Sequence, residues 1–148
     1  MILFVAVIAK KKKGKYAPGE FKLLVKRSST GLGLFTGEPI SKGDCVIEYV
    51  GRVVPEKEQY TSRSKYLFEI NSKLTIDGRP RINKAGYINH SCKPNCEIEI
   101  YRNRVFVMAL RKIKEGEELT YDYDTEYFDE HIKPKGCRCG TCLKNKKK

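Results

Sequence analysis

The hydrophobic positions of this chain fall into short runs rich in β-branched and aromatic residues, with glycine, proline and charged residues between them. Such runs favour strands, which are expected at 46–54, 66–70, 96–101, 104–110 and, less clearly, 119–123. The third and fourth runs are predicted to form a hairpin that closes around Arg102 and Asn103. Residues 55–64 favour one short helix, with Pro55 at or near its first turn. The pattern holds no repeat and no long amphipathic helix, so we predict a mostly-β domain of short strands.

Length and composition favour a single domain, because 148 residues with 40% hydrophobic residues can enclose one compact core. The formal net charge of +12 is concentrated at the two ends, which contain nine lysines and no acid. These lysines are Lys10, Lys11, Lys12, Lys13, Lys15, Lys144, Lys146, Lys147 and Lys148. We interpret both ends as solvated, disordered tails that could contact nucleic acid or chromatin through counterion release. Tails that serve only solubility are the alternative.

Residues 1–9 are apolar, and the lysines follow them. A signal peptide carries its positive residues before the apolar run, and a run this short cannot span a bilayer. We therefore interpret this segment as a β-strand or as a stretch from upstream of the gene. No membrane association is expected.

Cysteine usage indicates a metal site. Cys137, Cys139 and Cys142 form a C-x-C-x-x-C cluster, and three thiolates this close can bind one tetrahedral zinc ion. Without a secretory signal, metal binding is favoured over a disulfide framework. The candidates for the fourth ligand are Cys45, Cys92, Cys96, His90 and His131. Free thiols on a frayed tail are the alternative, although chains tend to avoid exposed free cysteines.

Four further segments carry candidate chemistry. They are the G-x-G stretch at 29–35, the block Y-I-N-H-S-C-K-P-N at 87–95, E-L-T-Y-D-Y at 118–123, and Tyr66 in Y-L-F-E-I. Thr36 stands where a dinucleotide-binding fingerprint would need its third glycine, so the G-x-G stretch alone is equally an ordinary turn. Tyr121 and Tyr123 lie on one face of a strand, where a half-buried aromatic pair is the ordinary interpretation.

Together, these segments and the cysteine cluster resemble the SET-domain family of protein lysine methyltransferases, in family order from Gly31 to Cys142. The resemblance implies several small β-sheets, few short helices, a pseudoknot of the I-N-H-S-C and E-L-T-Y-D-Y segments, and a C-terminal zinc-bound post-SET segment. It divides the chain into a basic N-terminal tail (1–20), a SET domain (21–130), and a post-SET segment with a lysine tail (131–148).

The resemblance also implies residue roles. The residues matched to binding of S-adenosylmethionine are Thr30, Leu32, Gly33, Tyr66, Asn89, His90 and Arg138. The matched catalytic set is Tyr123 as the catalytic tyrosine, Tyr121 as the residue that limits the methylation state, and Tyr66 as a wall of the lysine channel. One structural zinc would be bound by Cys92, Cys137, Cys139 and Cys142. The chain departs from the family at Arg52, at Gly86-Tyr87 and in its shortened cysteine cluster.

The implied function is transfer of methyl groups to lysine in a basic protein, most often a histone tail or a histone-like protein. Eight acids and no lysine or arginine lie within 115–130, and this segment would attract a basic peptide or form a solvated loop. The alternative is a non-catalytic zinc-stabilised β module that binds nucleic acid or chromatin through its lysine tails. The protein is expected inside the cell: in the nucleus or on chromatin if it is eukaryotic or delivered to a host, and otherwise in the cytoplasm.

Overall fold

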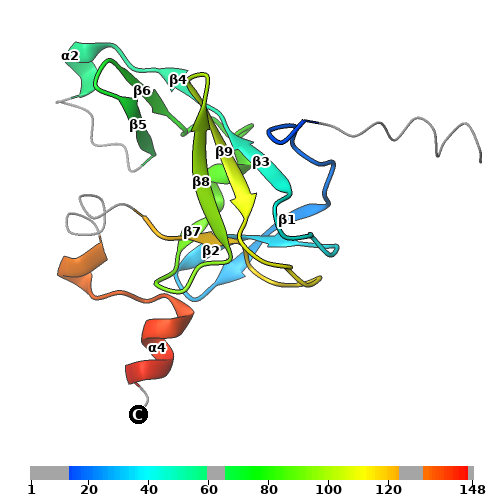
Figure 1. Ribbon diagram of the computed structural model, residues 1–148. Helices are drawn as coiled ribbons and strands as arrows, with labels where there is room; N and C mark the ends of the chain where they lie inside the picture. The colour runs from blue at the N-terminus through cyan, green and yellow to red at the C-terminus, as the bar shows by residue number, and fades with distance from the viewer. Residues whose placement is uncertain (1–13, 60–65, 124–131, 147–148) are drawn as a thin grey trace, which may run out of the picture.

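A computed structural model describes residues 14–59, 66–123 and 132–146 (Figure 1). Its strands are β1 Leu23–Ser28, β2 Gly31–Thr36, β3 Cys45–Tyr49, β4 Arg52–Val53, β5 Leu67–Asn71, β6 Leu74–Asp77, β7 Asn89–His90, β8 Cys96–Tyr101, β9 Arg104–Ala109 and β10 Thr120–Tyr121. Its helical segments are α2 Glu56–Gln59, the 3₁₀ turns η1 Lys84–Tyr87 and η3 Lys133–Lys135, and α4 Gly140–Lys146. None of the described helices is both long enough and apolar enough to cross a membrane.

The strands form four small sheets, with orders β1-β2, β3-β9-β8, β4-β6-β5 and β7-β10. All the pairings are antiparallel except that of β7 with β10. The apolar core joins the sheets, and side chains such as Leu34, Val46, Ile88, Val107 and Leu119 are almost completely buried in it. The predicted fold class, mostly β with small sheets and few short helices, is confirmed.

The hairpin of β8 and β9 has the register predicted from its turn. Tyr101 pairs with Arg104, so Arg102 and Asn103 are the two turn residues. Both have positive φ, 50° and 61°, as a two-residue turn with the twist of the flanking strands requires. Asn tolerates this backbone conformation well, which explains why the turn was visible in the sequence.

The predicted strand at 46–54 is divided in two by tertiary contacts. β3 ends at Tyr49, and the backbone N–H of Val50 donates to Oδ1 of the buried Asn83 at 3.0 Å. A Cβ on Gly51 would lie 2.4 Å from the carbonyl oxygen of Asp77, so the chain passes close to β6 here. β4 then begins at Arg52 in a different sheet. In the sequence these residues look like one strand, because β-branched residues recur along the whole run. In the structure the two halves pair with different strands.

Other elements differ from the expectation as well. The predicted strand at 119–123 is paired only over Thr120–Tyr121. The helix expected at 55–64 spans Glu56–Gln59, and residues 60–65 lie outside the described part of the chain. The sequence pattern missed β1, β2, β6 and β7. The strand expected at 1–9 also lies outside the described residues.

Each lysine-rich end has a part within the described residues, whereas solvation of the ends stays a prediction because residues 1–13 and 147–148 lie outside them. The Tyr16 ring stacks on Tyr101 with centroids 4.6 Å apart, and its hydroxyl donates to Glu99 at 3.0 Å. Lys15 makes an ion pair with the same carboxylate at 3.0 Å. At the other end, α4 continues to Lys146, because the backbone N–H of Leu143 bonds to Cys139 and starts a helical turn.

Candidate active site and metal centre

The site is built on the parallel pairing of β7 with β10. Asn89 pairs with Thr120 and His90 with Tyr121, so the two segments that resemble the SET family lie side by side. The buried Asn95 joins them: its Nδ2 donates to the Glu118 carbonyl at 2.8 Å, and its Oδ1 accepts the Thr120 N–H at 2.9 Å. The final Asn of the P-N turn therefore holds the two segments in register.

On one side of this pairing lies a cavity of about 220 Å³, here called the tyrosine cavity. Its lining residues are Tyr49, Tyr66, Leu67, Phe68, Glu69, Gly86, Ile88, Ile98, Tyr121, Asp122 and Tyr123. The rings of Tyr121 and Tyr123 lie 4.9 Å apart. The Tyr123 hydroxyl donates to the carbonyl oxygen of Ile88 at 2.6 Å. Among the described residues that line this cavity, two are acids and none is Lys or Arg.

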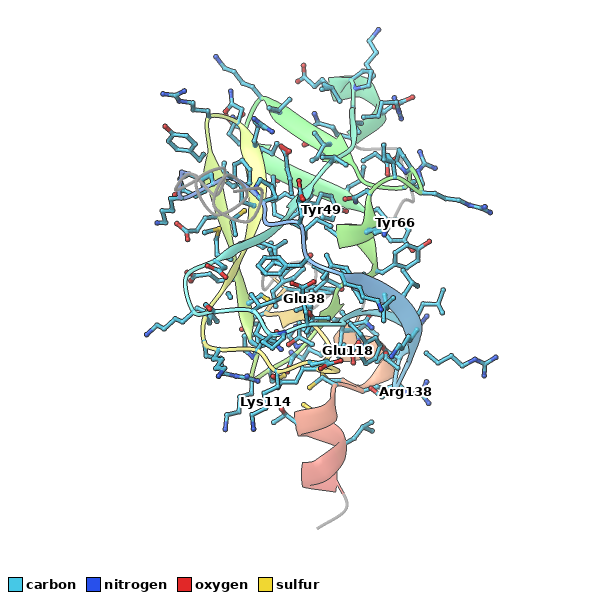
Figure 2. All side chains as sticks on the ribbon, turned by 90° about the vertical axis from the view of Figure 1, so that its right-hand side faces the viewer. Glu38, Tyr49, Tyr66, Lys114, Glu118 and Arg138 are labelled. Atoms are coloured by element: carbon cyan, nitrogen blue, oxygen red, sulfur yellow. The ribbon has the colours of Figure 1, made fainter. Side chains whose placement is uncertain are left out.

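On the other side lie two adjoining cavities of about 390 and 300 Å³, here called the polar cavities. Both are lined by Thr30, Asn89, His90 and Cys139. Further residues that line one of them include Ser29, Ser91, Lys93, Glu118, Thr120, Thr141, Ile132, Lys135, Cys137 and Arg138. Figure 2 shows this division: Tyr49 and Tyr66 lie apart from Glu118 and Arg138, which lie on the side of α4.

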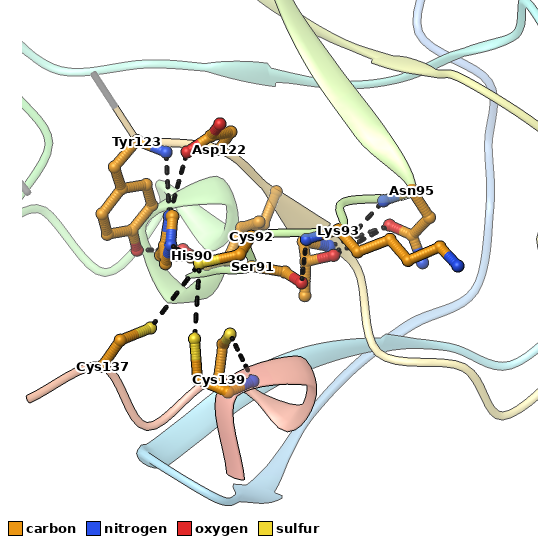
Figure 3. Close-up of polar contacts among 12 residues, drawn as sticks. His90, Ser91, Cys92, Lys93, Asn95, Asp122, Tyr123, Cys137 and Cys139 are labelled. Atoms are coloured by element: carbon orange, nitrogen blue, oxygen red, sulfur yellow. Dashed lines mark hydrogen bonds and ion pairs between the residues drawn. The ribbon is translucent and has the colours of Figure 1, made fainter. Parts of the chain in front are cut away.

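Tyr123 lines both the tyrosine cavity and the smaller polar cavity. Among the described residues, it is the one that lines both sides of the site. The backbone N–H of Tyr123 also donates to Nδ1 of His90 at 3.1 Å, which ties the tyrosine to β7 (Figure 3).

The protonation state of His90 follows from its contacts. Since Nδ1 accepts the Tyr123 N–H, the neutral ring carries its proton on Nε2, which faces Sγ of Cys92 at 3.3 Å. Burial lowers the pKa of His90 below its ordinary value, against the opposing effect of the Asp122 carboxylate. His90 is therefore a neutral donor near the cysteines and is poorly suited to act as a base.

The residues matched to cofactor binding do not all line the same cavity. Thr30, Asn89, His90 and Arg138 line the polar cavities. Tyr66 lines only the tyrosine cavity. Leu32 and Gly33 are in β2 and are not among the lining residues described here. Leu32 contributes its carbonyl oxygen, which accepts from the side-chain amide of Asn89 at 2.9 Å.

The four cysteines of the predicted zinc site lie close together, and Figure 3 labels three of them, Cys92, Cys137 and Cys139. Sγ of Cys92 is 3.9 Å from Sγ of Cys137 and 3.6 Å from Sγ of Cys142. The backbone N–H of Cys142 contacts Sγ of Cys139 at 3.5 Å. Four thiolates about 2.3 Å from one tetrahedral zinc would be about 3.8 Å apart. The two distances from Sγ of Cys92 therefore agree with the spacing in a tetrahedral site.

The other candidates for the fourth ligand are placed elsewhere or lie beside the cluster. Cys45 and Cys96 are buried in the β core, and His131 is outside the described residues. His90 belongs to a group with Cys92, Cys137 and Cys139 whose ligand atoms lie within 4.8 Å of one another. Cys142 is not in that group, so the structure leaves both His90 and Cys142 beside the other three cysteines as candidates for the remaining ligand.

The thiol of Cys139 has an unusual environment. Burial acts against its thiolate, but hydrogen bonds from the backbone at Cys92 and Cys142 outweigh burial and lower the pKa of Cys139 to about 7. A thiolate is the form of cysteine that binds metal ions. Cys139 is therefore the member of the cluster whose thiolate is favoured near neutral pH, whereas burial raises the pKa of Cys92 and Cys137.

Several residues of the site were missed by sequence reasoning, among them Asn95, Glu118, Tyr49 and Phe68. Asn95 and Glu118 stand inside the quoted motifs and had no individual role assigned to them, whereas Tyr49 and Phe68 looked like ordinary strand residues.

The acids expected near the lysine channel do not lie in one place. Their carboxylates differ in placement: Glu117 pairs with Arg111, Glu118 lines a polar cavity, Asp122 lines the tyrosine cavity, and 124–130 lie outside the described residues.

Comparison with known proteins adds three findings. Residues 31–124 match the SET domain family. The chain is 36% identical to histone-lysine N-methyltransferase ash1 of Drosophila melanogaster, over 84% of this chain and 6% of that protein. It is 35% identical to the H3 lysine-4 specific histone-lysine N-methyltransferase of Schizosaccharomyces pombe, over 96% of this chain and 16% of that protein. Human histone-lysine N-methyltransferase 2D is 35% identical over 74% of this chain and 2% of its own length, so the chain spans a small part of these relatives.

Proposed function

Because this chain belongs to the SET-domain family of protein lysine methyltransferases, we propose that it transfers methyl groups from S-adenosylmethionine to the side-chain amine of lysine in a basic protein. The observation that carries the proposal is the position of Tyr123, which lines the tyrosine cavity and a polar cavity at once. A group transfer between two bound molecules needs two binding sites that meet at one point. The target lysine would enter the tyrosine cavity, and the cofactor would bind in the polar cavities.

The tyrosine cavity suits a lysine side chain. The ordinary pKa of lysine is about 10.4, yet only the neutral amine can attack a methyl group. Aromatic faces that exclude water disfavour the ammonium form and lower this pKa, so the proton can leave to water before attack. Tyr121 and Tyr123 provide such faces, together with hydroxyls that can orient the amine. A dedicated general base is then unnecessary, which agrees with the contacts of His90.

The polar cavities suit the cofactor. Their volumes lie within or close to the range of about 300–1,000 Å³ that is typical of small-molecule sites. When bound there, S-adenosylmethionine supplies a methyl group on a positively charged sulfur. Asn89, Thr30 and Arg138 offer hydrogen-bonding groups to its polar parts. Tyr123 lines both sides and its hydroxyl contacts the Ile88 carbonyl, so these two oxygen atoms are the groups that would make weak C–H···O contacts with a methyl group.

We propose that the cysteine cluster binds one structural zinc ion through Cys92, Cys137, Cys139 and Cys142, which is supported by the contacts of Cys92 with Cys137 and Cys142 and of Cys142 with Cys139. The ion would hold the C-terminal segment against β7. Since Cys139 and Arg138 line the polar cavities, this link completes the cofactor site. The binding energy of the metal is then used to build the site as well as to stabilise the fold.

The acidic lining of the tyrosine cavity supports a basic substrate. Glu69 and Asp122 lie along it, and an acidic rim attracts cationic peptides and repels anionic ones. The curated relatives are named histone-lysine N-methyltransferases, so a histone tail or a histone-like protein is the proposed substrate. A nuclear, chromatin-associated location follows if this substrate is correct. Contact of the lysine-rich ends with nucleic acid is proposed as a non-specific addition.

One pair of measurements tests the function. Calorimetry with S-adenosylmethionine should show binding of one molecule per chain, and labelled S-adenosylmethionine should transfer its methyl group to lysine in a histone mixture. Binding without transfer to any lysine-rich substrate would indicate a highly selective or inactive enzyme. A chain that binds no cofactor yet binds DNA would support the alternative, a non-catalytic zinc-stabilised module.

A further inference from the structure

The side-chain amide nitrogen of Asn89 is surrounded by three oxygen atoms. Its Nδ2 lies 3.0 Å from Oγ of Ser28, 2.9 Å from the carbonyl oxygen of Leu32 and 2.9 Å from Oε1 of Glu118. A carbonyl oxygen and a carboxylate can only accept hydrogen bonds, so the nitrogen end of the amide must face them. The orientation of Asn89 is thus set by its neighbours, and its Oδ1 faces away from these three acceptors.

Glu118 is the charged member of this set. A carboxylate forms stronger and shorter hydrogen bonds than a neutral acceptor. Its backbone is held on both sides: its carbonyl oxygen accepts from Asn95 at 2.8 Å, and the N–H of the next residue, Leu119, bonds to Leu34 at 2.8 Å. The carboxylate is therefore presented to Asn89 from a rigid position, and it also lines the larger polar cavity.

Gly33 provides the space for this contact. A Cβ at this position would lie 2.2 Å from Oε1 of Glu118 and 3.1 Å from Nδ2 of Asn89. Gly31, two residues earlier, has a φ of 118°, which favours glycine for its backbone, whereas Gly33 is not among the glycines with positive φ. Glycine is thus favoured at these two positions for different physical reasons. At Gly31 the reason is the backbone conformation, and at Gly33 it is the close packing of the Glu118 carboxylate.

We propose that Glu118 is a positioning residue for Asn89, and that Gly33 is a glycine because it must admit the Glu118 carboxylate. Glu118 holds the amide so that its Oδ1 accepts from a donor group of the cofactor. This inference rests on the proposed cofactor site, and it assigns a task to the glutamate of the E-L-T-Y-D-Y segment. The same contact links three segments of the chain, at 28–33, at Asn89 and at Glu118.

The test is calorimetric binding of S-adenosylhomocysteine, the stable product, to the full chain and its variants. Glu118→Ala and Gly33→Ala are each expected to raise its Kd about tenfold, since each removes a hydrogen bond to a charged group. Glu118→Gln keeps an acceptor oxygen and should recover most of the affinity. In steady-state kinetics the two damaging variants should raise KM for S-adenosylmethionine and leave kcat within about twofold.

Glu117→Ala is the matched control. It removes the neighbouring carboxylate, which pairs with Arg111 on the surface, and should leave the Kd unchanged. The double variant Gly33→Ala with Glu118→Ala should bind about as well as Glu118→Ala alone, because the added methyl then meets no carboxylate.

Three outcomes overturn the inference. They are an unchanged Kd in a folded Glu118→Ala variant, a Glu118→Gln variant as weak as Glu118→Ala, and a further tenfold loss from Gly33→Ala when Glu118 is already alanine. Wild-type protein that binds no S-adenosylhomocysteine would instead overturn the proposed function, and the inference with it.

Discussion

The tyrosine cavity and the polar cavities share Tyr123 but are built in different ways. The tyrosine cavity is lined by residues between Tyr49 and Tyr123, on strands and turns that belong to the β core. The polar cavities need residues 132–141, which follow the core in sequence and include two cysteines of the cluster, Cys137 and Cys139. One half of the site therefore depends on packing of the β domain, and the other half depends on docking of the C-terminal segment.

The two regions also differ in charge. Among the described lining residues, Glu69 and Asp122 are the charged side chains of the tyrosine cavity, whereas Lys93, Lys135 and Arg138 line the polar cavities together with one acid, Glu118. A basic peptide is attracted to the first, and a ligand that carries a carboxylate finds cations in the second. The difference indicates that the two halves can be damaged separately by single substitutions.

The largest effect is expected at the residue that the two regions share. Tyr123→Phe should lower kcat about 10²–10³-fold, because the hydroxyl that orients the reacting groups is lost while the ring still fills the wall. Steady-state assays and cofactor titration would measure kcat and Kd separately. Tyr101→Phe is the control, since this exposed tyrosine packs on Tyr16 at the hairpin. A Tyr123→Phe enzyme with wild-type kcat would place the catalytic hydroxyl elsewhere.

Removal of the metal should damage only the polar cavities. Cys139→Ser is expected to reduce zinc from one ion per chain to none and to weaken cofactor binding about 10–100-fold. Circular dichroism should retain the strand signal, because the β core keeps its own packing. Elemental analysis, calorimetry and dichroism together check this outcome.

Cys96→Ala is the control for the metal experiment, because it removes a cysteine that lies outside the cluster. This cysteine is buried in the core, so its substitution should lower the melting temperature and leave the zinc content unchanged. Full activity in metal-free wild-type protein would contradict the coupling of zinc to the site. Zinc binding of unchanged affinity in Cys92→Ser would exclude Cys92 as the fourth ligand.

A smaller effect is expected from the charge at the tyrosine cavity. Glu69→Lys should raise KM for a basic peptide about fivefold, and the change should shrink as salt is added. KM for S-adenosylmethionine should stay constant, since Glu69 lines only the peptide side. Glu97→Lys is the matched control on β8, where the neighbouring Ile98 faces the cavity and Glu97 is exposed. Equal effects of the two substitutions would indicate a general change of net charge.

The smallest change concerns the product. Tyr121 places a hydroxyl in the tyrosine cavity, so the wild-type enzyme is expected to make mainly monomethyl-lysine. Tyr121→Phe should shift the ratio of dimethyl- and trimethyl-lysine to monomethyl-lysine upward about fivefold, the equivalent of one hydrogen bond. Mass spectra of the peptide products measure the ratio directly. Wild-type product that is mostly trimethyl-lysine would contradict this assignment.

Local signals account for what could be predicted of the fold. The hairpin of β8 and β9 was predictable because Arg102 and Asn103 carry its turn chemistry within the sequence itself. β1 was missed because its two faces alternate poorly, with most of its residues partly or fully exposed. The interruption after Tyr49 depends on Asn83 and Asp77, about thirty residues away, and has no local signal. The division into 1–20, 21–130 and 131–148 stays a prediction.

The sequence by itself determined the chemistry that this protein carries: two tyrosines two residues apart, three closely spaced cysteines, and the Asn-His pair of the I-N-H-S-C block. Residue type and short spacing follow from the chain directly. The family resemblance implied that Cys92 joins a cluster 45 residues later in the chain, and the tertiary structure places these sulfurs together. Only the tertiary structure decided that Glu118 meets Asn89 beside Gly33. Such pairings depend on which strands lie side by side, and this is set by burial of the whole core rather than by any local pattern.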